Sequence, residues 1–393
     1  MTLPNITVKL SRLTERCSHL YIKSLTLEGY RNLEISELFP SKGINVICGD
    51  NAQGKTNLVE CIWLFTGGRS FRGAKDSELI AFNGKAAKVK AVFDAAGREQ
   101  TIEINIRASR RTAILNDVPK NYMSQIIGVF CAVIFSPNHL TLIKNGPEER
   151  RNFTDSAICQ IKPSYAHLLA KYRRVLNERN ALLKDIPRHR ELEDTLDIWN
   201  ERLAHEGAMI TYERLRYIAQ LSQAAEKFYD GISDGKEQLK ITYKTAVPND
   251  LRSDQENIKT FLLERLRRKQ NDDIYCGFTT SGVHRDDMTV KINGRDAKSF
   301  GSQGQQRSAV LALKLAEAEI LGEAKGEKPV ILLDDVLSEL DASRKNYLLN
   351  KLNDRQVFIT CCESSVRSEN IIWIKNGKIS ASEEFDIVSS CGK

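Results

Sequence analysis

The chain has 393 residues, of which 41% are hydrophobic and 28% are charged, and its formal net charge is +7. This composition supports a folded core and excludes both wholesale disorder and a fibrous repeat. No apolar run is long enough for a membrane-spanning helix, and the charged first 20 residues are not typical of a secretory signal. Nine cysteines, several inside apolar runs, indicate reduced buried thiols, so we expect a cytoplasmic protein. The mild positive charge is compatible with a polyanionic partner.

Residues 21–145 have the pattern of strands joined by turns. Val89, Ala91 and Phe93 alternate with polar neighbours, and the isoleucines at 102, 104 and 106 do the same. A period of two predicts half-buried antiparallel strands. The apolar run at residues 44–47 predicts a short buried strand.

Residues 146–273 have a helical pattern. Apolar residues recur at intervals of three and four in two runs, which are separated by a break at Pro187. The second run is close to a heptad pattern over four repeats, so the two runs predict an antiparallel helical hairpin. Both an ordinary helical subdomain and a short projecting arm are compatible with this pattern. A third amphipathic stretch covers residues 258–268.

From residue 274 the sequence returns to alternating helices and strands. Residues 330–333 predict a fully apolar strand, as do residues 357–360. Residues 371–374, followed by Asn376-Gly377, predict a hairpin. The simplest architecture is an α/β nucleotide-binding core that is split by a helical insertion.

One motif fits the phosphate-binding pattern GxxxxGK[ST] in full, between the strand at 44–47 and a predicted helix at 57–64. Its residues are Gly49, Asp50, Asn51, Ala52, Gln53, Gly54, Lys55 and Thr56. Glycines let successive amide groups turn toward phosphate oxygens, and the helix N-terminus adds partial positive charge. We expect Lys55 to bind the β- and γ-phosphates of ATP and to act in catalysis, and Thr56 to bind Mg²⁺.

Two carboxylates follow the strand at 330–333. We expect Asp334 to hold Mg²⁺ and Asp335 to orient or deprotonate the attacking water. The Asp335 side chain is one methylene shorter than a glutamate, so we expect hydrolysis to be slow.

A third motif, at residues 302–307, opens a predicted helix at 308–321. Ser302, Gly304 and Gln305 offer a hydroxyl, free amides and a helix dipole, which together favour phosphate. Because the phosphate-binding loop of the same copy already holds a nucleotide, we expect this surface to contact the nucleotide of a second copy. The segment 338–341, SELD, is expected near the same contact between the two copies.

The order of these motifs resembles that of ABC-type ATPase heads and, within the SMC/Rad50-like branch, that of the RecF family. The similarity runs from residue 21 to about residue 379. It is carried by GYRN (29–32), NAQGKTNL (51–58), RSFR (69–72), FSP (135–137), GPEERR (146–151), HRDD (284–287), SQGQQRS (302–308) and LDDVLSELD (333–341). The sequence departs from the family pattern at Val283 and Asn138, and after Thr360, where the histidine of transporter ATPases is missing.

The resemblance implies an α/β fold, an ABC-type (SMC/Rad50-like) P-loop ATPase head with a helical insertion lobe. We therefore divide the chain into an N-terminal extension (1–20), the first half of the head with the Walker A motif and an antiparallel β lobe (21–145), the helical insertion lobe (146–273), and the second half of the head with the signature, Walker B and D-loop (274–393). By analogy, Arg31 and Asn57 would also contact the nucleotide.

The resemblance also implies a function. Members of the family bind ATP with Mg²⁺, form ATP-dependent homodimers and bind single-stranded and gapped or duplex DNA through the phosphate backbone. A weak DNA-dependent ATPase resets them, and they act with RecR and RecO in DNA repair, replication-gap recovery and SOS induction. We expect the same here, at the nucleoid and without a membrane.

Two alternatives stay open: another SMC-like ATPase that serves a nuclease partner, and an ATP-binding scaffold without turnover. The candidate DNA contacts are Arg110-Arg111, Arg173-Arg174 and Arg267-Arg268-Lys269, each of which is also compatible with a solvated surface. The RSFR run (69–72) fits either DNA contact or lobe packing. For Arg285, an ion pair within a turn is favoured over a ligand contact.

Overall fold

The computed structural model describes residues 18–361 and 370–381. Most of the predicted extension, residues 1–17, lies outside these ranges, as do Cys17, Cys362 and Cys391. Within the described ranges, no helix combines the length and the hydropathy needed to cross a bilayer.

The N-terminal part forms an antiparallel sheet whose inner face is buried. Its strand order is β3 (Ser36–Leu38), β2 (Tyr21–Glu28), β5 (Ala86–Ala95), β6 (Arg98–Arg107), β7 (Arg110–Leu115) and β8 (Val118–Lys120). β5 and β6 pair over ten residues. The apolar side chains that alternate along them are buried and the intervening ones are mostly not, which confirms the predicted period of two.

A second sheet forms the centre of the head. Its order is β17 (Lys378–Ala381), β16 (Asn370–Lys375), β4 (Ile44–Cys48), β15 (Val357–Cys361), β14 (Val330–Leu333) and β9 (Ala132–Phe135). All pairs are parallel except β16–β17, the hairpin predicted from Asn376-Gly377, both of which have positive φ. The carboxyl ends of β4, β15 and β14 therefore meet at one edge, where ligands bind in open α/β sheets.

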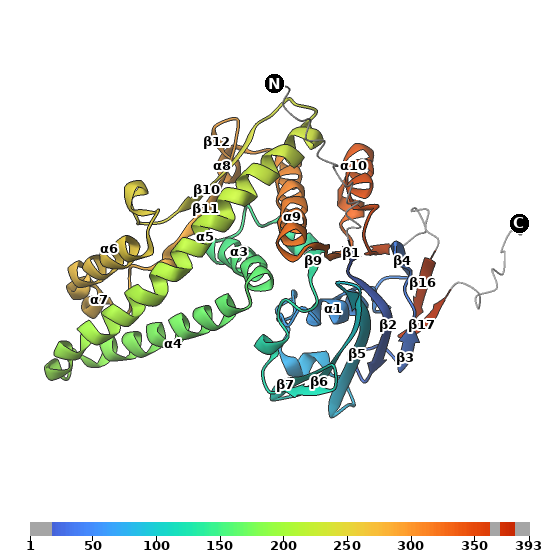
Figure 1. Ribbon diagram of the computed structural model, residues 1–393, viewed down its shortest axis with the longest axis horizontal. Coiled ribbons are helices and arrows are strands. Elements are labelled where there is room, and N and C mark those ends of the chain that lie inside the picture. The colour runs from blue at the N-terminus through green and yellow to red at the C-terminus, as the bar shows by residue number, and fades with distance from the viewer. Residues whose placement is uncertain (1–17, 362–369, 382–393) are drawn as a thin grey trace, which may run out of the picture.

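Two long helices form the predicted antiparallel hairpin. α4 (Ser164–Asp185) and α5 (Leu196–Ser233) pack along each other, and Figure 1 shows them projecting away from the sheets as an arm. At about 1.5 Å per residue, the 38 residues of α5 span roughly 57 Å. α5 thus runs from the end of the arm to the top of the head in Figure 1, near α10 (Ala342–Leu352).

The hydrophobic core of the arm lobe includes residues on both sides of position 273. It contains Tyr217 and Leu262 from the helices, and also Met288 and Val290 from β11 (Asp287–Ile292). β11 pairs with β10 (Leu239–Lys244), a strand inside the stretch that the sequence predicted to be helical. β10 alternates buried and exposed residues, so a period-two signal was present there.

The helix that follows the signature motif belongs to both cores. α9 (Gln303–Lys325) places Leu311 and Leu315 in the core of the head, and Leu313 and Ala316 in the core of the arm lobe. Because the two faces of one helix are buried on opposite sides, the signature motif at its start is fixed relative to both lobes.

The remaining elements complete the connections between these parts. They are β1 (Ser18–His19), α1 (Lys55–Leu64), η1 (Asp76–Leu79), η2 (Met123–Gln125), α2 (Pro137–Leu140), α3 (Pro147–Ile161), η3 (Arg190–Thr195), η4 (Asn249–Leu251), α6 (Gln255–Arg268), α7 (Gln270–Cys276), η5 (Val283–Arg285), β12 (Arg295–Asp296), α8 (Ala297–Phe300), β13 (Glu327–Lys328) and η6 (Leu337–Glu339).

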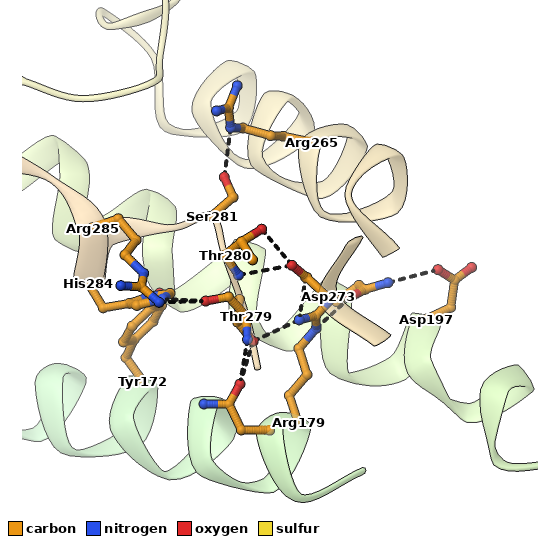
Figure 2. A network of polar contacts seen from close by, with 12 residues as sticks. Tyr172, Arg179, Asp197, Arg265, Asp273, Thr279, Thr280, Ser281, His284 and Arg285 are labelled. Carbon is orange, nitrogen blue, oxygen red and sulfur yellow. Dashed lines mark hydrogen bonds and ion pairs between the residues drawn. The ribbon is translucent and has the colours of Figure 1, made fainter. Parts of the chain in front are cut away.

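A buried arginine holds the arm together (Figure 2). The fully buried Arg179 of α4 donates hydrogen bonds to Asn200 of α5, Asp273 of α7 and Thr279, at 2.7–2.8 Å. Asp273 in turn accepts from the backbone and hydroxyl of Thr280. Such a charged group is stable in a core only when it is paired, so these bonds fix α4, α5 and α7 to one another.

The HRDD motif lies against the same cluster of polar contacts. Arg285 donates to the carbonyl of Thr279 at 3.4 Å and stacks on the ring of Phe278. Among the described residues Arg285 forms no ion pair, so the prediction of an ion pair within the turn was wrong. The planar guanidinium is instead satisfied by a carbonyl and an aromatic face.

Candidate functional site

The loop at residues 49–56 curls between β4 and α1, and its shape depends on two glycines with positive φ. A Cβ atom on Gly49 (φ 150°) would lie 2.3 Å from the carbonyl oxygen of Ile374, and one on Gly54 (φ 119°) would lie 2.7 Å from the Leu33 side chain. Neither position has room for a side chain. The loop backbone therefore packs directly against β16 and the turn after β2.

Lys55 lies inside the concave side of this loop. Its side chain is almost fully buried, and its Nζ donates to the carbonyl oxygens of Gly49 (2.6 Å) and Asp50 (3.0 Å). A charged ammonium group held within the loop is suited to bind a phosphate there. The Asn32 side chain supports the loop from outside by donating to the carbonyl of Gln53 at 3.1 Å, and the Gln53 side chain accepts from the backbone of Asn376.

Thr56 and Asp334 lie together although 278 residues separate them. The Thr56 hydroxyl donates to Asp334 Oδ1 at 2.9 Å. Burial raises the pKa of Asp334, and the hydrogen bond from Thr56 opposes that rise. A hydroxyl and a buried carboxylate side by side are hard oxygen donors, so the pair fits Mg²⁺, with phosphate oxygens and water as the remaining ligands.

The backbone of Asp335 is held in an unusual conformation by Thr360 of β15. Asp335 has a positive φ of 52°, and its N–H donates to the Thr360 hydroxyl at 2.8 Å. That hydroxyl also lies 3.2 Å from Asp334 Oδ1. Thr360 reaches both carboxylates because β15 pairs with β14, the strand that the two acids follow. It contacts both the predicted Mg²⁺ ligand Asp334 and the predicted catalytic residue Asp335, a role that the sequence analysis missed.

Arg31, predicted to contact the nucleotide, is bound by a buried glutamate. Its Nε and Nη2 donate to the carboxylate of Glu60 at 2.5 and 3.0 Å, and the hydroxyls of Tyr30 and Ser70 also donate to that carboxylate. Glu60 is fully buried in α1, so this ion pair fixes the GYRN turn beside the loop. The only signal for it was one carboxylate within the apolar run 58–64. A contact between Arg31 and nucleotide stays a prediction.

Asn57 and Arg72 extend this arrangement toward the carboxylates. Asn57 donates to Asn32 at 2.7 Å and accepts from Arg72 Nη1 at 2.9 Å. The positive charge of Arg72 also opposes the rise in the pKa of Asp334, so Arg72 lies near the paired acids. Arg72 and Arg69 line a cleft of about 820 Å³ that continues along α2, α3 and Arg173.

The signature motif forms a capping box at the start of α9. The Ser302 hydroxyl accepts from the N–H of Gln305 at 3.2 Å, and Gln305 Oε1 accepts from the N–H of Ser302 at 2.8 Å. Gly304 lies in the first turn beside the guanidinium of Arg344. Within the described chain, no hydrogen bond joins residues 302–307 to residues 49–57. In one copy the two phosphate-binding elements are therefore separate.

The SELD segment contacts both the paired acids and the signature helix. Ser338 Oγ donates to the carbonyl of Asp335 at 2.7 Å, and Glu339 forms an ion pair with Arg307 of α9 at 2.5 Å. Asp341 caps α10 by accepting from the N–H of Arg344. The segment thus links the Walker B region to the signature motif.

The three basic clusters differ in how their charges are paired. Arg267, Arg268 and Lys269 form ion pairs with acids of the arm, and Arg111 forms one with Asp76. Arg110 donates to the carbonyl of Asn121. By contrast, Arg173 and Arg174 are exposed, and neither guanidinium has a hydrogen bond or ion pair to any residue in the described ranges. They line two neighbouring clefts.

Comparison with known protein families and sequences gives a consistent result. The family model described as the RecF/RecN/SMC N terminal domain matches residues 21–376. A DNA replication and repair protein RecF from Ruminiclostridium cellulolyticum is 41% identical over 344 residues, which cover 87% of this chain and 92% of that protein. The protein of the same name from Clostridium acetobutylicum is 36% identical over 92% of this chain and 99% of its own length.

Solved structures agree with the sequences. A structure described as the recombination mediator protein RecF-ATP in the RecFOR pathway superposes with a TM-score of 0.88, at 39% identity, over 92% of this chain and 98% of that one. The Smc head domain from Pyrococcus furiosus superposes with a TM-score of 0.53 at 17% identity, over 92% of this chain and 96% of that one, which is a likeness of fold.

Proposed function

The chain belongs to the RecF family of recombination mediators, and from this premise we propose that it is an ATP-gated DNA-binding switch. It binds ATP, dimerises around it and engages gapped DNA, and slow hydrolysis resets it. The observation that carries the proposal is the pairing of Thr56 with Asp334 at 2.9 Å beside the lysine-containing loop, while the signature motif of the same copy is separate from that loop.

ATP is expected to bind with its phosphates in the loop at residues 49–56. The Lys55 ammonium would exchange its carbonyl partners for phosphate oxygens, and the amides at the start of α1 would donate to the same group. Mg²⁺ held by Thr56 and Asp334 would neutralise charge on the phosphates.

The signature motif of a second copy would close the site. Ser302 has a hydroxyl proton left to donate, and the N–H groups of Gln303 and Gly304 lie in the first turn of a helix with 23 residues. Each would face the γ-phosphate held by the partner. Two such sites in a symmetric dimer make the association depend on ATP.

Hydrolysis is assigned to Asp335. Its backbone has a positive φ and is held by Thr360, and it directly follows the predicted Mg²⁺ ligand Asp334. From there it would orient the attacking water and accept its proton. A scaffold that binds ATP without turnover has no use for this arrangement.

Asp335→Asn should retain ATP-dependent binding of a gapped duplex and lose hydrolysis. Replacing a general base costs about 100-fold or more in rate, whereas the amide keeps the size of the side chain. Phosphate release should be measured with and without the duplex, with Asp117→Asn in an exposed turn as the control. An equal and negligible rate in the wild type and in Asp335→Asn would support the scaffold instead.

The DNA surface is proposed to include the arginines that line the two clefts. Arg69, Arg72 and Arg173 line one cleft, and Arg174 lines the next. Lys171 and Lys259 also line the second cleft, but they are already paired with acids, and Arg72 donates to Asn57. Arg173 and Arg174 have no hydrogen bond or ion pair within the described ranges. Charges without protein partners can neutralise DNA phosphates without first breaking an ion pair. Contact with the backbone, rather than with bases, fits a mediator that acts at any gap.

Charge reversal tests whether this surface contacts DNA or only carries positive charge. The double variant Arg173→Glu, Arg174→Glu should bind a gapped duplex at least tenfold more weakly, and the slope of log affinity against log salt should fall by about two. Arg267→Glu, Arg268→Glu is the matched control, because those arginines are already paired with acids. Equal losses in the two double variants would contradict this placement.

The partners follow from the family. We propose that the protein works with RecR and RecO at DNA gaps, in repair, in recovery of replication and in SOS induction. A pull-down with RecR that depends on ATP and gapped DNA would support this, and capture of a nuclease in its place would support the alternative SMC-like ATPase.

A further inference from the structure

The turn that follows α5 places a carboxylate against the signature motif. Glu237 Oε1 accepts a hydrogen bond from Gln305 Nε2 at 2.5 Å, and Glu237 Oε2 accepts one from the Tyr229 hydroxyl at 2.6 Å. Tyr229 is fully buried in the last turns of α5, and its contact with Glu237 contributes to raising its pKa, after burial. Glu237 therefore connects the arm helix to the first turn of α9.

This contact decides which way the Gln305 amide points. A glutamine amide has one oxygen that accepts and one nitrogen that donates. Because Glu237 takes the NH₂ group, the oxygen must face the N–H of Ser302, where it accepts at 2.8 Å. Hydrogen bonds thus connect Tyr229 to Glu237, Glu237 to Gln305 and Gln305 to Ser302. Glu237, which lies outside α9, therefore fixes the orientation of the capping box.

The turn that carries Glu237 is itself anchored. α5 ends at Ser233, and the next two residues, Asp234 and Gly235, both have positive φ. The backbone of Gln238 pairs with Asn293 through two hydrogen bonds of 2.8 and 2.9 Å. Glu237 therefore lies in a turn that is tied to the connection between β11 and β12.

We propose that Glu237 is a positioning residue for the contact between the signature motif and the nucleotide of a second copy. It holds the Gln305 amide so that Ser302 and the amides of the first turn of α9 face outward in one arrangement before the partner arrives. Preorganised donors bind phosphate more tightly than donors that must be ordered on binding. The inference rests on the proposed ATP-dependent dimer.

Glu237→Ala should weaken the ATP-dependent dimer about tenfold. Gln305 would lose its charged partner and could rotate, so the donors would have to be ordered on association. The dimer dissociation constant is measured by sedimentation with Mg²⁺ and ATPγS. Affinity for a fluorescent ATP analogue, measured on monomers, should stay unchanged, because Glu237 has no contact with residues 49–57 in the described chain.

Two further variants separate positioning from folding. Glu237→Gln can still accept from Gln305 and should dimerise within about threefold of the wild type. Glu226→Ala removes a neighbouring acid that contacts Gln238 at 3.2 Å and should have no effect. An ATP-dependent dimer of Glu237→Ala as tight as that of the wild type would overturn the inference. If the wild type itself stays monomeric with ATPγS, the proposed function fails first.

Discussion

Lys55→Met should lose ATP binding by more than about 100-fold and with it every ATP-dependent property. The lysine supplies a buried positive charge on the concave side of the loop. Within the described residues, no other cationic side chain donates to the carbonyl oxygens of Gly49 and Asp50. Hydrogen bonds to charged groups contribute about 1.5–3 kcal/mol each, and the ammonium can make two to phosphate. Methionine keeps the length and the apolar stem, so the fold should persist.

Equilibrium binding of a fluorescent ATP analogue measures this loss. Lys42→Met is the matched control, because Lys42 is exposed at the opposite end of β4, over the ring of Tyr21. The control should bind ATP normally. Normal ATP affinity in Lys55→Met would show that the loop at residues 49–56 is not the nucleotide site.

Ser302→Arg should bind ATP as the wild type does and yet fail to dimerise. The side chain of Ser302 is exposed at the first turn of α9 and makes no contact with residues 49–57. An arginine there removes the helix cap, which costs about 1 kcal/mol, and projects a long cation into the surface that a partner must approach within hydrogen-bond distance. The dimer dissociation constant should rise by more than about 100-fold.

Light scattering after size exclusion, with ATP present, measures the mass of this variant. Ser302→Ala provides a graded comparison, since it removes the hydroxyl without adding bulk and should weaken the dimer by a smaller factor. Thermal unfolding of the ATP-free variants should differ by only a few degrees. A stable dimer of Ser302→Arg with ATP would show that the dimer interface does not include Ser302.

The parts of the site that the sequence predicted are those built from contiguous backbone. The loop at 49–56 and the capping box at 302–305 need particular residues at fixed spacing, because glycines, a helix start and a cap act over a few neighbouring residues. The strand at 330–333 followed by two acids is local in the same way. The alternating patterns of β5 and β6 likewise reflect one buried face, so the fold class followed from sequence.

The parts that the sequence could not predict depend on distant residues. Glu60 in α1 binds Arg31, Thr360 reaches Asp335 from the next strand, and Glu237 contacts Gln305 from 68 residues away. No local sequence pattern identifies these side chains, because each makes its contact only after the fold brings distant strands and turns together. The basic clusters show the same limit: only ion-pair partners in the fold distinguish Arg173 from Arg267.

The central claim is that two copies share each nucleotide, and a mixture of Lys55→Met and Ser302→Arg tests it most directly. In a mixed dimer, one site combines both changes, and the other site has the intact loop of one copy and the intact signature of the other. We predict that neither variant alone forms a dimer with ATP, whereas the equimolar mixture does and regains phosphate release. A mixture that stays monomeric and inactive, although both variants are folded and Ser302→Arg binds ATP, would contradict the shared site.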